Sequence, residues 1–130
     1  MKRFALMALT LMMLGSPAYA ISEFNKQWKA QYLGDDASED FKRSGRKAGC
    51  YVCHVKGEKK DEARNEYGNA LHKHLDAENF SKERIKAEPE KVKAEILEAF
   101  KKVAPVKSKD GKAFGEKIKA GELPATDAKL

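Results

Sequence analysis

Apolar side chains recur at helical spacing through most of the chain, and this pattern predicts an all-α fold. Phe24, Trp28 and Tyr32 lie four residues apart, which places them on one face of a helix over 21–33. A longer helix is predicted from Pro89 to about Val103, and its apolar face consists of Val92, Ile96, Ala99, Phe100 and Val103. No strand signal is found. The sequence therefore predicts three or four amphipathic helices joined by short loops.

Polar residues mark the starts of the shorter helices. Either Ser38 or Asp36 is expected to cap one short helix, and Ser81 to cap another, because their side-chain oxygens accept hydrogen bonds from the first free amides of a helix. A last short helix is predicted around Phe114 and Ile118. The residues after it are expected to be frayed.

The segment from Asn65 to Leu75 also shows helical periodicity. At about 100° per residue, the residues that share its apolar face are Tyr67, Ala70, Leu71, His74 and Leu75. His72 falls well away from this face. Of these two histidines, His74 is therefore predicted to face the interior.

The N-terminus has the three parts of a signal peptide. Lys2 and Arg3 precede an apolar run from Phe4 to Leu14, and Ala18-Tyr19-Ala20 supplies a small-x-small cleavage pattern. The run is shorter than the roughly 20 apolar residues that a membrane span needs. The sequence predicts a signal peptide over 1–20, a mature domain over 21–130 with no integral membrane span, and export to the periplasm or beyond.

Charge and length limit the possibilities further. The chain has 130 residues, enough for one small domain. Removal of the leader lowers the formal charge from +6 to about +4, because two basic residues leave and no acidic residue does. Acidic and basic residues are interleaved, and no aromatic and basic pattern indicates nucleic acid. A mildly basic surface is compatible with an acidic partner.

The stretch Cys50-Tyr51-Val52-Cys53-His54 carries the most specific chemical signal. In C-x-x-C-H, two thiols three residues apart lie on one side of a helical turn, where they reach the two vinyl groups of one porphyrin. The imidazole that follows then binds the iron axially. Over these five residues the chain resembles the c-type cytochromes. The rest of the chain matches that family only in general character.

The resemblance implies a small cytochrome c-like helical domain packed around one covalently bound haem c and its iron. It implies that Cys50 and Cys53 form the thioethers and that His54 is the proximal ligand. It further implies an electron carrier rather than an enzyme, with redox proteins as partners. Attachment of such a haem outside the cytoplasmic membrane agrees with the predicted leader.

Other interpretations of the two cysteines stay open. A thioredoxin-like redox pair needs a βαβ setting, and no strands are predicted. A zinc site with His72 and His74 needs two ligands only two residues apart, which is poor spacing on one helix. A plain disulfide is the third alternative.

The second axial position is the main departure from the family pattern. The four methionines, Met1, Met7, Met12 and Met13, all lie in the predicted leader, so no methionine is left to bind iron. His74 is the favoured candidate for the distal iron ligand, with His72, another group or an open site as alternatives. An open site would instead indicate a haem-based small-ligand sensor or a peroxidase-like protein.

Overall fold

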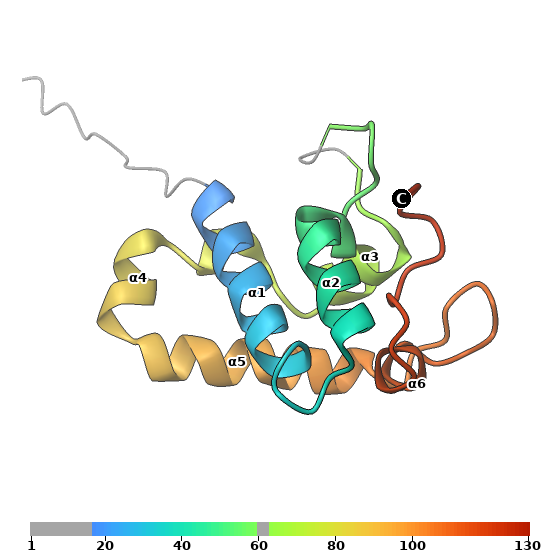
Figure 1. Cartoon of the computed structure of the whole chain (residues 1–130). Coiled ribbons are helices and arrows are strands. Elements are labelled where there is room, and N and C mark those ends of the chain that lie inside the picture. The colour runs from blue at the N-terminus through green and yellow to red at the C-terminus, as the bar shows by residue number, and fades with distance from the viewer. Residues whose placement is uncertain (1–16, 60–62) are drawn as a thin grey trace, which may run out of the picture.

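The computed structural model describes residues 17–59 and 63–130, and these residues form a helical domain without strands (Figure 1). The elements are α1 (Pro17–Tyr32), α2 (Glu39–Ala48), the 3₁₀ helix η1 (Gly49–Val52), α3 (Glu66–His72), the 3₁₀ helix η2 (Ala77–Asn79), α4 (Lys82–Ala87), α5 (Pro89–Val103) and α6 (Phe114–Lys119). The predicted all-α class is confirmed. Most of the predicted leader lies outside the described residues, and helix α1 runs across its expected cleavage point.

Helix starts follow the polar residues of the sequence. The hydroxyl of Ser38 accepts a hydrogen bond from the Phe41 amide at 3.2 Å, so Ser38 and not Asp36 caps α2. Ser81 caps α4 in the same way, through the Arg84 amide at 3.1 Å. Both caps satisfy amides that a helix leaves without a partner in its first turn.

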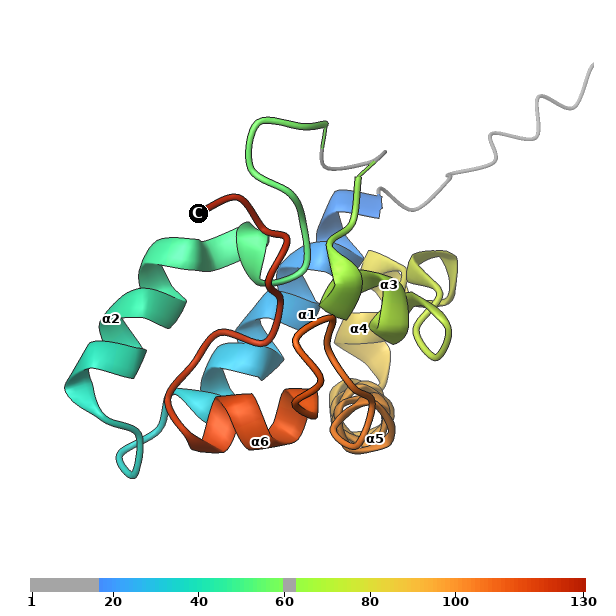
Figure 2. The same cartoon turned by 90° about the vertical axis from the view of Figure 1, so that its right-hand side faces the viewer.

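Helix α5 is the helix against which several of the others pack. Figure 1 shows α1 and α2 side by side above it, and Figure 2 looks along its axis, with α6 beside it. Helices α1, α3 and α4 all contact α5. All five residues of its predicted apolar face are buried, which confirms that prediction.

Aromatic side chains join the helices in the core. Trp28 of α1 is 2% exposed, and its ring contacts that of Phe41 in α2 with centroids 6.2 Å apart. Its indole nitrogen also donates a hydrogen bond to the hydroxyl of Tyr67 in α3 at 3.2 Å. Tyr67 in turn meets the ring of Phe114 in α6 at 5.1 Å. The partly polar aromatic residues are thus buried with their polar atoms satisfied.

The C-terminal segment packs on the domain, so the prediction of a frayed end is wrong. The carboxylate of Asp127 accepts a hydrogen bond from the Glu66 amide at 2.9 Å, which caps the first turn of α3. The carbonyl of Ala128 accepts one from the Lys56 amide at 2.8 Å, and Ala128 itself is buried. These partners lie some 60 or more residues away in the sequence, so no local pattern indicates them.

Glu66 binds two distant segments through its carboxylate. It accepts hydrogen bonds from the Ser108 hydroxyl at 2.7 Å, the Lys109 amide at 2.8 Å and the Thr126 amide at 2.8 Å. Burial raises the pKa of Glu66, but these hydrogen bonds lower it by more, and the net pKa lies below its ordinary value. The ionised form therefore stabilises the fold.

No helix within 17–59 and 63–130 has the length and apolar character that crossing a membrane requires.

We expect Glu66→Gln to lower the free energy of unfolding by about 1–3 kcal/mol at pH 7, because charge-assisted hydrogen bonds are weakened. A carboxyl with a lowered folded pKa stabilises above its unfolded pKa of about 4.3, and loses this effect as pH falls through the folded value. The difference between wild type and variant should therefore shrink below about pH 4. Urea unfolding at pH 7 and pH 3 measures it. Glu98→Gln, on the exposed face of α5, is the control and should differ little from wild type at either pH.

Candidate functional site

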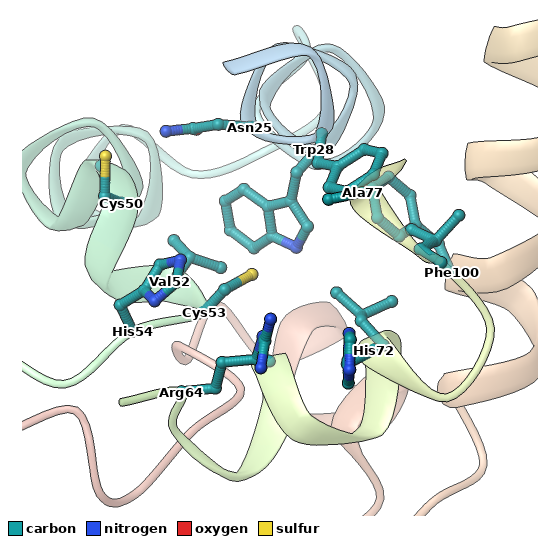
Figure 3. A pocket seen from close by; sticks show the side chains of 15 residues that line it. Asn25, Trp28, Cys50, Val52, Cys53, His54, Arg64, His72, Ala77 and Phe100 are labelled. Atoms are coloured by element: carbon teal, nitrogen blue, oxygen red, sulfur yellow. The ribbon is translucent and has the colours of Figure 1, made fainter. Parts of the chain in front are cut away.

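A cavity of about 260 Å³ opens beside the C-x-x-C-H motif, between α1, α3 and α5 (Figure 3). Cys50, Cys53 and His54 all line it. Arg64, just before α3, and His72, at the end of α3, line it as well. The structure thus brings all three motif residues to one cavity.

Most of the cavity wall is apolar. Phe24 and Trp28 come from α1, Leu71 from α3 and Phe100 from α5. In Figure 3 the indole of Trp28 points from α1 into the space between the motif and Phe100. Trp28 is therefore both a core residue and part of the cavity. A wall of this kind suits a flat, largely apolar group held by a few polar contacts.

Gly49 sets the direction in which the motif leaves α2. Its φ of 53° lies in the left-handed region, where a side chain is disfavoured, and its amide donates to the Gly45 carbonyl to end the helix. The amides of Cys53 and His54 then both donate to the Cys50 carbonyl, at 3.2 and 3.1 Å. This tight turn places the two thiols and the imidazole next to the same cavity.

The imidazole of His54 is held by the loop that returns to α3. His54 is 5% exposed, and its Nδ1 lies 3.3 Å from the Ala63 carbonyl oxygen. A carbonyl accepts only, so this bond requires the proton on Nδ1, and in that tautomer Nε2 is the unprotonated ring nitrogen. A backbone partner of this kind also fixes the orientation of the ring, as is usual for histidine ligands.

Asn65 ties the motif to α3, and sequence analysis did not identify it as a site residue. Its side chain is 0% exposed, and its Nδ2 lies within hydrogen-bond distance of the Tyr51, Val52 and His54 carbonyls, at 3.0, 2.9 and 3.2 Å. Its Oδ1 accepts from the Gly68 amide at 2.9 Å and so caps α3. A helix-capping asparagine is visible in the sequence. The contacts of its Nδ2 with the motif cannot be seen in the sequence, because they depend on how the motif lies against α3 in the fold.

Gly68 allows α3 to lie directly on the motif. A Cβ at this position would overlap with the Cys53 carbonyl and meet the Arg64 side chain at 3.2 Å. The absence of a side chain is therefore what permits this close approach. Helix α3 is consequently held against the motif at two points, Asn65 and Gly68.

Cys53 does not have the character of the reactive thiol in a thioredoxin-like pair. Both cysteines are free, and desolvation, together with the charge of Cys50, raises the pKa of Cys53 to about 12. Thioredoxin-like chemistry instead needs a lowered thiol pKa. The βαβ setting of such enzymes is also missing, because the described part of the chain contains no strand.

The two remaining histidines lie in different places. Helix α3 ends at His72, so its periodicity does not extend to His74, and the prediction that His74 faces the interior is wrong. His74 is exposed and lines a second hollow with Glu95 and Lys102. His72 lines the cavity of the motif instead. The four residues considered for zinc therefore share no single cavity, and no cluster of three or more His, Cys, Asp or Glu in 17–59 and 63–130 is arranged to hold a metal ion.

One polar atom of the cavity has no partner. The Oδ1 of Asn25 is buried without a hydrogen bond, and in Figure 3 the Asn25 side chain extends from α1 toward Cys50. A buried polar group without a partner is costly, and it is usually satisfied by a ligand or water. A ligand with an apolar body and some polar periphery fits this lining.

Comparisons with known proteins identify no relative: no family model, curated protein or solved structure matches the chain. The resemblance to c-type cytochromes accordingly rests on residues 50–54 alone.

We expect Asn65→Ala to lower the free energy of unfolding by about 2–4 kcal/mol, because it removes a helix cap and leaves buried carbonyl groups without a donor. Asn69→Ala is the matched control, four residues further along α3. The Asn69 side chain is exposed and donates one bond, to the Arg64 carbonyl at 3.3 Å, so its loss should cost about 0.5 kcal/mol or less. Urea unfolding followed by circular dichroism compares the two. Equal costs would show that Asn65 does not have this anchoring role.

Proposed function

We propose that this protein is an exported monohaem c-type cytochrome that carries single electrons. The observation that carries the proposal is that Cys50, Cys53 and His54 line one largely apolar cavity. Each thiol would add its sulfur to one carbon and its hydrogen to the other carbon of a vinyl group, so attachment consumes no oxidant. His54 would bind the iron through Nε2. Haem iron supplies one-electron chemistry by cycling between its ferric and ferrous states.

The surroundings of the motif support this assignment. Trp28 and Phe100 provide an apolar wall for a porphyrin, and Asn25 provides a polar group for its periphery. The cavity volume of about 260 Å³ is slightly below the ~300–1,000 Å³ typical of cofactor sites. We therefore expect part of the porphyrin rim to lie outside the walls, where a redox partner reaches it.

The charged surface next to the motif supports an acidic redox partner. Arg43, Arg46 and Lys47 are all exposed on α2, the helix that leads directly into the motif. Basic side chains at this position would attract acidic groups and orient a partner toward the haem.

Arg64 and His72 favour a second candidate function, a small-ligand binder or a peroxidase-like protein. Both line the cavity, and both come from the same side of it, just before α3 and at its end. A histidine and an arginine above an open iron position would stabilise a bound diatomic ligand or peroxide, because the distal polarity decides between binding and electron transfer. This function requires that the sixth position of the iron be open.

We expect the full chain, expressed with a c-type haem attachment system, to carry one haem that resists extraction by acidified organic solvent. Cys50→Ala and Cys53→Ala should each retain one thioether, which shifts the pyridine haemochrome band because one vinyl group stays unsaturated. The double variant should release its haem on extraction. Tyr51→Phe, inside the motif, is the control and should behave as wild type. A wild-type chain that binds no haem covalently would rule out the proposed function.

Carbon monoxide separates the two candidate functions. An electron carrier with two strong axial ligands should leave the visible spectrum of the ferrous protein unchanged under carbon monoxide, because no coordination position is open. Immediate formation of the carbon monoxide adduct by wild type would instead support the small-ligand or peroxidase-like function.

A further inference from the structure

The side of α3 that faces the cavity includes Leu71 of the predicted apolar face, together with Gly68 and His72, which the sequence pattern left off that face. Gly68 and His72 are four residues apart and so lie on the same face of the helix. Gly68 on this face touches the Cys53 carbonyl, and His72 lines the cavity one turn further on. Tyr67 points instead into the core, against Phe114. One face of α3 therefore packs in the core, and another faces the motif and its cavity.

We propose that His72 is the second axial ligand of the haem iron. This inference rests on the proposed function, since it requires a haem attached at Cys50 and Cys53. In Figure 3, His54 lies on the side of the cavity formed by the motif and His72 on the side formed by α3, with Cys53 between them. His74 lines a different hollow. His72 is thus the histidine that shares the cavity of the motif with His54.

The position of His72 is well suited to ligation. Its helix is fixed on the motif by the Asn65 side chain and by the close approach at Gly68. The imidazole itself is exposed at the end of the helix and is not packed in the core. The backbone therefore holds the residue in place while the side chain stays free to take the orientation that a metal ligand needs.

Two histidine ligands have spectroscopic consequences. Both are strong-field donors, so the ferric protein should be low-spin and six-coordinate. Its reduction potential should lie below that of a cytochrome with histidine and methionine ligands, because methionine raises the potential.

The test compares the purified haem-containing wild type with His72→Ala, His74→Ala and His72→Met. Electron paramagnetic resonance and visible spectra report the spin state of the ferric iron. Wild type and His74→Ala should be low-spin, whereas His72→Ala should be high-spin and should bind added imidazole at least about 10-fold more tightly, because no internal ligand competes. His72→Met should return to low spin with a sulfur-to-iron charge-transfer band and a higher potential. Far-UV circular dichroism checks that the exposed substitution leaves the fold intact.

The outcomes distinguish this inference from the proposed function. A high-spin wild type that carries covalent haem would overturn His72 ligation and leave the haem assignment standing. The inference also fails if His72→Ala stays low-spin, or if His74→Ala is the variant that becomes high-spin. Absence of covalent haem in wild type would instead overturn the proposed function itself.

Discussion

The buried side chain of Asn65 is the contact on which the rest of the site depends. It bonds the backbone of the C-x-x-C-H motif on one side and the first turn of α3 on the other. The loop that it closes also supplies the Ala63 carbonyl that orients His54. A single amide thus fixes the motif, the histidine and the helix relative to one another. Buried polar groups of this kind specify one arrangement because any other leaves them without partners.

Glu66, the next residue, extends this anchor to the far end of the chain. Its carboxylate and its amide bond residues from two distant segments, at 108–109 and at 126–127. The start of α3 is therefore held from both sides, by the motif and by the C-terminal segment. The other end of α3 has no comparable anchor among the bonds described above. There the buried side chains of Leu71 and Leu75 hold the chain on either side of His72.

Local sequence patterns predicted those features whose causes are local. The apolar face of α5 follows from its periodicity, the caps at Ser38 and Ser81 from short-range hydrogen bonding, and the grouping of Cys50, Cys53 and His54 from their spacing. Features that need distant partners were missed, as the packed C-terminal segment shows. The error at His74 has a different origin. The helix ends at His72, so the periodicity of about 100° per residue that placed His74 on the apolar face does not extend to it.

The position of Cys53 bears on the order of events during assembly. In the folded domain its thiol is desolvated, and its carbonyl lies under Gly68 of α3. A desolvated thiol ionises poorly, and the thiolate is its reactive form. If haem is attached as proposed, the thioethers therefore form before α3 docks on the motif. Docking of α3 is then a later step of folding.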